Sequence, residues 1–331
     1  MKIINGNELI LAKEELDKGN LVIFPTETVY GLGANALNSE MVNKIYEVKE
    51  RAKDNPLIVH LKNKEEITKY AKINNEIEKK LIDSFMPGPF TLILEKKSVI
   101  PSNVTCNLDT VGIRIPQDEI AHHLLSILDY PIAAPSANLS GRPSGTRCQD
   151  IIEEFDGKFN LMIDGGEAKI GLESTVCKVI NGVPTILRPG FITKEDIEMV
   201  IGVCQVSPFA LKEARGKVES PGMLYRHYAP KTKCLLVDKD KIKEVTLKHD
   251  EVILIGSSFL KDIKCKHFLY YGDDLITIAH NIFRLLREAD MLNGKIIIIE
   301  AVDTKGLGLA IMNRLIRTCE FNYIRGINEN Y

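Results

Sequence analysis

Short apolar runs, rich in β-branched and aromatic residues, recur through the first two hundred positions of the chain. Runs of this length between turn-forming residues predict strands. We expect strands at 21–24, 56–61, 90–95, 111–116, 131–136, 160–166, 174–180 and 185–190. Between some of these runs, the segments 38–51, 74–85 and 117–129 repeat apolar residues at helical spacing and predict amphipathic helices.

The arrangement of these elements predicts the fold class. Strands and helices are mixed but do not strictly alternate, and the runs at 90–95 and 111–116 have the pattern of antiparallel neighbours. The runs at 174–180 and 185–190 flank Asn181-Gly182, which is a dipeptide typical of tight hairpins. Residues 1–206 are therefore predicted to form one α/β domain around a mixed, twisted sheet.

The pattern changes after residue 206. Residues 207–232 contain three prolines and no core periodicity, and Lys212–Lys233 carries six Lys or Arg against two Glu, so this stretch is expected to be a linker. Residues 233–331 then alternate apolar runs with helical patterns, which predicts a second, smaller, Rossmann-like α/β domain with a parallel sheet.

Composition narrows the class of protein. The 331 residues are 44% hydrophobic and 27% charged, as in a globular protein, and the net charge of −2 excludes a molecule that binds nucleic acid by its overall charge. No apolar run approaches a membrane span, and the N-terminus does not have the pattern of a signal peptide. The seven cysteines form no CxxC pair, so we expect free thiols, no zinc site and a cytoplasmic location.

Polar side chains concentrate where the predicted strands end. The segment 24–33, FPTETVYGLG, carries three hydroxyl groups and one carboxylate directly after an apolar strand. Groups this dense need hydrogen-bond partners, either from the protein's own turn or from a ligand. At or near the ends of other predicted strands and helices stand the cations Lys49, Arg51, Arg114, Arg142 and Arg188. The loop 135–146 carries many hydroxyl groups.

Arginines and hydroxyls without a covalent nucleophile indicate a site that binds polyanions, and a phosphate-bearing substrate fits it best. The sequence has no nucleophile elbow, no catalytic triad spacing and no HExxH motif. Structural interpretations stay open: Lys49 and Arg51 could serve the end of a helix, and His60 could be a core histidine. Arg114 within an apolar strand needs an anion as its partner.

Several segments resemble, in this order, the motifs of L-threonylcarbamoyladenylate synthases with a YrdC-type catalytic domain. They are FPTETVYGLGANA, KERAKDNPLIVH, MPGPFTLIL, TVGIRIP, APSANLSGRPSGT, DGG, ESTV and LRPG. Lys49-x-Arg51 and Ser136-x-Asn138 match the Lys-x-Arg and Ser-x-Asn elements of that family. SPGMLYRHYAP and GLGLAIMNRLIRTC resemble the linker and the C-terminal domain of its long form.

The resemblance implies an ATP-dependent reaction of L-threonine with bicarbonate, which yields L-threonylcarbamoyl-AMP and pyrophosphate. The threonylcarbamoyl group then passes to an adenosine of tRNA through a separate threonylcarbamoyl transferase complex. Mg²⁺ is expected to arrive on the ATP phosphates rather than on protein side chains. Stable direct binding of nucleic acid and association with a membrane are not expected.

The resemblance also implies roles for individual residues. Lys49 and Arg51 are expected to be catalytic, because charge grows on the phosphates during adenylation. L-threonine and bicarbonate are expected to contact Thr28, His60, Arg114 and Ser174. ATP is expected to contact Arg51, Asn55, Thr110, Ser136, Asn138, Ser144 and Arg188. Tyr225, His227 and Tyr228 in the linker are expected to form a lid.

Two other hypotheses compete with this one. The cations could bind the backbone of double-stranded RNA without any turnover, although the negative net charge argues against this. The fold could also serve another nucleotidyl or carbamoyl transferase, but such proteins carry extra metal-binding regions that this chain lacks. The GLG segment at 306–308 is a weak dinucleotide signal, because the full GxGxxG pattern is absent.

Overall fold

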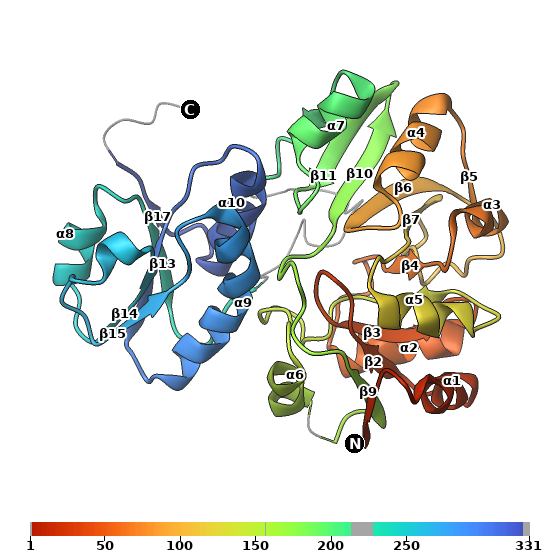
Figure 1. Ribbon diagram of the computed structural model, residues 1–331, viewed down its shortest axis with the longest axis horizontal. Helices are drawn as coiled ribbons and strands as arrows, with labels where there is room; N and C mark the ends of the chain where they lie inside the picture. The colour runs from red at the N-terminus through yellow and green to blue at the C-terminus, as the bar shows by residue number, and fades with distance from the viewer. Residues whose placement is uncertain (1, 156, 213–227, 327–331) are drawn as a thin grey trace. The chain divides into compact units, whose positions relative to one another are not determined.

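The computed structural model describes residues 2–155, 157–212 and 228–326 (Figure 1). The chain separates into two compact units, the first of Met1–Ser140 and Ser144–Leu224, the second of Gly141–Pro143 and Tyr225–Tyr331. Most of the predicted linker at 207–232 lies outside the described residues, so the predicted domain boundaries stay a prediction. Within the described residues, no helix combines the length and the apolar character that crossing a membrane requires.

The first unit is built on one mixed sheet, as predicted. Its strand order is β1-β9-β2-β3-β8-β4-β7-β6-β10-β11-β12, with β5 on β6, and the β6–β7 and β10–β11 pairs are antiparallel. The strands are β1 (Lys2–Asn5), β2 (Val22–Phe24), β3 (Gly31–Asn35), β4 (Ile58–His60), β5 (Ala71–Lys72), β6 (Phe90–Lys96), β7 (Thr110–Arg114), β8 (Ile132–Ala133), β9 (Leu161–Asp164), β10 (Thr175–Ile180), β11 (Val183–Arg188) and β12 (Gln205–Val206).

Helices cover both faces of this sheet. They are α1 (Leu9–Asp17), α2 (Ser39–Val48), α3 (Ile67–Tyr70), α4 (Glu76–Phe85), α5 (Glu119–Ser126), α6 (Cys148–Phe155) and α7 (Lys194–Ile201). Val22 and Phe24 pack with residues of α1 and α5, whereas Ile23 between them packs with residues of α2. Successive strand residues point to opposite faces, so a strand that is covered on both faces reads as a continuous apolar run.

One strand of the sheet is not evident from the sequence. No strand is predicted from the sequence at Gly31–Asn35, but this segment forms β3 and pairs antiparallel with β2, so the turn after β2 ends before Gly31. Glycine disfavours strands, which hides this one from a pattern search. The glycines are needed because a Cβ at Gly33 would lie 2.9 Å from a ring carbon of Phe24.

The second unit has a five-stranded parallel sheet, as its alternating pattern predicts. Its strand order is β15-β14-β16-β13-β17, and each neighbouring pair in this order is parallel. The strands are β13 (Cys234–Val237), β14 (Val252–Gly256), β15 (His267–Tyr270), β16 (Ile296–Glu300) and β17 (Tyr323–Ile324). The helices are α8 (Ile242–Leu247), α9 (Leu275–Met291) and α10 (Leu307–Thr318). All seven cysteines of the chain are free thiols.

Residues 141–143 belong to the second unit although they lie within the sequence of the first. Asp290 at the end of α9 accepts hydrogen bonds from the Arg142 guanidinium at 2.9 Å and from the backbone N–H groups of Lys231 and Thr232. The N–H of Ala229 donates to the carbonyl of Gly141 at 2.8 Å. These contacts hold the three residues within the second unit.

Candidate active site

The turn between β2 and β3 is closed by its own hydroxyl groups. Thr26 Oγ1 lies 2.8 Å from Thr28 Oγ1 and donates to the carbonyl of Val29 at 2.7 Å. Other loops fix the turn further, because Ile170 and Gly171 donate their N–H groups to the carbonyls of Glu27 and Thr28. These hydrogen bonds use the hydroxyl and backbone groups of the turn. The carboxylate of Glu27 takes no part in them and contacts another strand.

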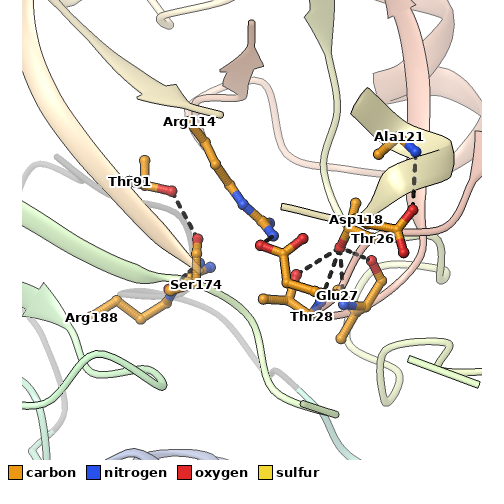
Figure 2. A network of polar contacts seen from close by, with 10 residues as sticks. Thr26, Glu27, Thr28, Thr91, Arg114, Asp118, Ala121, Ser174 and Arg188 are labelled. Atoms are coloured by element: carbon orange, nitrogen blue, oxygen red, sulfur yellow. Dashed lines mark hydrogen bonds and ion pairs between the residues drawn. The ribbon is translucent and has the colours of Figure 1, made fainter. Parts of the chain in front are cut away.

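Glu27 forms a buried ion pair with Arg114 (Figure 2). Arg114 Nη2 donates to Glu27 Oε1 at 2.8 Å, and the two side chains are only 5% and 7% exposed. Glu27 Oε2 and Arg114 Nε are buried and have no hydrogen-bond partner among the described residues. An ion pair that is taken out of water this completely is weak evidence for stability and better evidence for a function.

His60 lies beside Arg114, because β4 and β7 are parallel and these two residues are register partners. Burial, and then the positive charge of Arg114, lower the pKa of His60 from 6.5 to about 3. The imidazole is therefore neutral at physiological pH. Its Nδ1 is buried and has no hydrogen-bond partner in the part of the chain that the structure describes, and its ring meets the ring of Phe24 edge to face at 6.1 Å between centroids.

The lowered pKa of His60 predicts a specific pH dependence of stability. The unfolded chain binds a proton at this histidine below about pH 6.5 and the folded chain only near pH 3, so stability is lost as the pH falls between these values. Between pH 7 and 4.5, we expect the wild type to lose about 2 kcal/mol more unfolding free energy than His60→Gln. Denaturant unfolding at a series of pH values measures this. Parallel pH profiles for the two proteins would contradict it.

Ser174, directly before β10, and Arg188, at the end of β11, form a second polar group (Figure 2). Ser174 Oγ lies 2.8 Å from Thr91 Oγ1, and Arg188 Nη2 donates to the carbonyl of Ser174 at 2.8 Å and to its Oγ at 3.2 Å. Gly190 makes this packing possible, because a Cβ there would lie 2.3 Å from the backbone nitrogen of Thr175. Arg188 thus fixes the position of the Ser174 backbone and of its hydroxyl group.

Lys49 lies at the end of α2 and is only 1% exposed. Its ammonium donates to the carbonyl oxygens of Ser136, at 2.6 Å, and of Asn138. The side chains of these two residues are joined to each other, since Ser136 Oγ donates to Asn138 Oδ1 at 2.6 Å. The Lys-x-Arg and Ser-x-Asn segments are therefore one structural element rather than two separate motifs.

The remaining predicted ATP contacts lie around this element. Arg51 donates to the carbonyls of Asn55 and Pro56, both at 3.1 Å, and the buried Asn55 Oδ1 has no partner within residues 2–155, 157–212 and 228–326. Ser144 Oγ donates to Glu173 Oε1. Thr110 begins β7 and lines a small pocket together with Pro56. The role of these residues toward a nucleotide stays a prediction.

The structure adds residues that sequence reasoning did not select. Glu27, Thr91 and Glu173 each contact a predicted site residue directly. Glu27 could have been found from the sequence, because a carboxylate between two threonines directly after a buried strand is unusual. Thr91 and Glu173 could not be found in this way. Thr91, for example, lies next to Ser174 only because of the strand register in the folded chain.

The predicted lid falls largely on residues that the structure does not describe. Tyr225 and His227 lie outside the described residues. Tyr228 is buried within the second unit, where its ring stacks on Phe283 at 5.2 Å and lies 5.5 Å from the guanidinium carbon of Arg314. The lid therefore stays a prediction. Among the described residues, no group of three or more His, Cys, Asp or Glu side chains could hold a metal ion.

Comparison with known proteins identifies the family. The family model described as telomere recombination matches residues 14–190, and the model for the C-terminal domain of threonylcarbamoyl-AMP synthase matches residues 192–319. Threonylcarbamoyl-AMP synthase of Pyrococcus abyssi is 42% identical, over 98% of this chain and 99% of the relative. That of Bacillus subtilis is 39% identical, over 97% and 95%.

A solved structure agrees with this over the whole chain. The crystal structure of P. abyssi Sua5 complexed with L-threonine has a TM-score of 0.93 and 41% identity, and the match covers 98% of this chain and 99% of that one. The fold and the comparisons together define an ATP-using enzyme of the nucleotidyltransferase class. Within that class, the chain belongs to the threonylcarbamoyl-AMP synthase family, in its two-domain form.

Proposed function

We propose that this chain joins L-threonine, bicarbonate and ATP into L-threonylcarbamoyl-AMP and pyrophosphate. The full-length likeness to the P. abyssi enzyme is the observation that carries the proposal. The site is consistent with it, since buried cations and unpartnered polar atoms lie close together without a covalent nucleophile among the predicted site residues. Such a site stabilises charge and holds reactants in position rather than forming a covalent intermediate.

The amino acid is proposed to lie between the β2–β3 turn and Ser174. Arg114 receives its carboxylate, and Thr28, His60 and Ser174 surround its amine, its hydroxyl group and the carbamate. A neutral His60 suits this position, because a second cation beside Arg114 would repel the ammonium group of threonine. The burial of these side chains keeps water from the carbamate, which loses CO₂ readily.

The nucleotide is proposed to lie over the element formed by Lys49, Ser136 and Asn138. Its further contacts are Arg51, Asn55, Thr110, Ser144 and Arg188. The carbamate oxygen attacks the α-phosphate, and negative charge grows on that phosphate and on the leaving pyrophosphate. Arg51 stabilises this charge directly, whereas Lys49 adds a positive charge while it holds the loop backbone.

Other components follow from the chemistry of the reaction. Mg²⁺ is proposed to arrive with ATP, because this ion usually keeps phosphate and water oxygens as ligands. The product is an activated mixed anhydride, so a separate transferase complex is proposed to pass it to tRNA, in the cytoplasm. Tyr225, His227 and Tyr228 are proposed to cover the site during the reaction.

The proposal is tested by mass spectrometry of the protein with ATP, Mg²⁺, L-threonine and bicarbonate. We expect threonylcarbamoyl-AMP and an equal amount of pyrophosphate, and loss of both when bicarbonate or threonine is left out. ¹³C-labelled bicarbonate should add one mass unit to the product. Salt-sensitive binding of double-stranded RNA without any ATP consumption would instead favour an RNA-binding module.

A further inference from the structure

Three buried polar atoms in the proposed amino-acid site have no hydrogen-bond partner among the residues that the structure describes. They are Glu27 Oε2, Arg114 Nε and His60 Nδ1, and they belong to residues linked by the ion pair and by strand register. A buried polar atom without a hydrogen bond costs about 1–3 kcal/mol. Three such atoms in neighbouring residues indicate that a bound ligand supplies their hydrogen-bond partners. The ligand must then carry both N–H donors and an acceptor.

This inference rests on the proposed function. We propose that Glu27 and Arg114 together recognise the two charges of the L-threonine zwitterion, and that Glu27 accepts the proton which the ammonium group must lose. Arg114 Nη2 remains on Glu27 Oε1, and Arg114 Nε is turned to the carboxylate of the ligand. Glu27 Oε2 then accepts an N–H of the ammonium group, whose nitrogen lies one carbon away from that carboxylate.

The neighbours of Glu27 favour this assignment. Arg114 from β7 contacts Glu27 directly, and His60 in β4 lies beside Arg114 as its register partner; Figure 2 also draws Asp118, with a contact to Ala121. Asp118 Oδ1 is engaged by the N–H of Ala121 at the start of α5. Among these groups, Glu27 is the carboxylate that contacts Arg114, so it stands where the amino acid is proposed to bind.

The chemistry needs such a proton acceptor. An ammonium nitrogen has no free electron pair and cannot attack carbon. One proton passes from nitrogen to Glu27 Oε2, and the freed pair forms a bond to the carbon of bicarbonate. The bond from that carbon to its hydroxyl oxygen breaks, and the hydroxyl leaves as water with a second proton from nitrogen. The carbamate nitrogen keeps one proton, and Glu27 returns its own to solvent before the next cycle.

The first test measures binding by calorimetry for wild type and Glu27→Gln, which keeps the size of the side chain. The ligands are L-threonine and its 2-hydroxy analogue, 2,3-dihydroxybutyrate, which has the carboxylate but no ammonium group. We expect Glu27→Gln to weaken threonine binding about tenfold or more, and to leave the analogue unchanged or tighter. Equal weakening of both ligands would mean that Glu27 only orients Arg114. Tighter binding of both would mean that Glu27 only competes with the ligand. Either result overturns the proposal.

The second test separates proton transfer from binding. At saturating substrates, the rate of Glu27→Gln should rise with pH as more threonine arrives as free amine, so the ratio of wild-type to variant rate should fall between pH 7 and 9. A ratio independent of pH would overturn the proton transfer. Glu27→Asp keeps the carboxylate and should recover part of the rate. It is the control for a folding defect in Glu27→Gln. If the wild type makes no threonylcarbamoyl-AMP, the proposed function fails instead, and the binding test still decides whether Glu27 recognises the ammonium group.

Discussion

Replacing Arg51 by alanine is expected to lower the rate of threonylcarbamoyl-AMP formation about 10²- to 10³-fold while L-threonine binding stays nearly intact. The Arg51 guanidinium donates to the backbone of Asn55 and Pro56. Its charge is proposed to act where negative charge develops on the phosphates, and such interactions mainly affect the transition state. Pyrophosphate release and threonine calorimetry measure the two effects separately.

Two further variants define what Arg51 contributes. Arg51→Lys keeps the charge but loses the planar fork, so it should recover only a small part of the rate. Lys194→Ala removes an exposed cation that pairs with Glu198 within α7 and should leave the rate unchanged. Lost threonine binding in Arg51→Ala, together with unchanged ATP binding, would place Arg51 in the amino-acid subsite and contradict the assignment.

The sequence predicts the fold well where burial controls the pattern. The strands that are covered on both faces, such as β2 and β16, read as continuous apolar runs, and the parallel sheet of the second unit follows from its alternation with helices. The strand β3 is missed because its glycines carry no strand signal of their own. They are selected by the ring of Phe24, which lies on another strand, so only the folded structure explains them.

The site is predictable as a set of residue types but not as a set of contacts. The cations and hydroxyls could be selected because they stand at strand and helix ends, and the family resemblance supplied their roles. The ion pair between Glu27 and Arg114 joins positions 87 residues apart, which no local pattern indicates. The same holds for Lys49, whose ammonium is satisfied by backbone carbonyls nearly ninety residues further along the chain.

The position of Lys49 leads to the second large expected effect. Lys49→Met keeps an unbranched side chain of similar length. It removes the ammonium group that donates hydrogen bonds to the carbonyl oxygens of Ser136 and Asn138. The carbonyl of buried Asn138 and that of half-buried Ser136 then lose a charged donor, so we expect a loss of about 2–4 kcal/mol of unfolding free energy. Because these carbonyls belong to the proposed nucleotide loop, KM for ATP should rise, and kcat/KM should fall about a hundredfold or more.

Denaturant unfolding and steady-state kinetics with varied ATP distinguish the two ways in which Lys49 can act. If Lys49 holds the loop, its replacement changes the unfolding free energy and KM for ATP together. Lys49→Arg should restore neither, because the Lys49 side chain is only 1% exposed and its buried site fits a compact ammonium but not a planar guanidinium. A fall in kcat alone, with unchanged stability and unchanged KM for ATP, would instead mean that Lys49 leaves the carbonyls and acts on the reacting phosphate. In that case the ammonium must exchange its two carbonyl partners for phosphate oxygens when ATP binds.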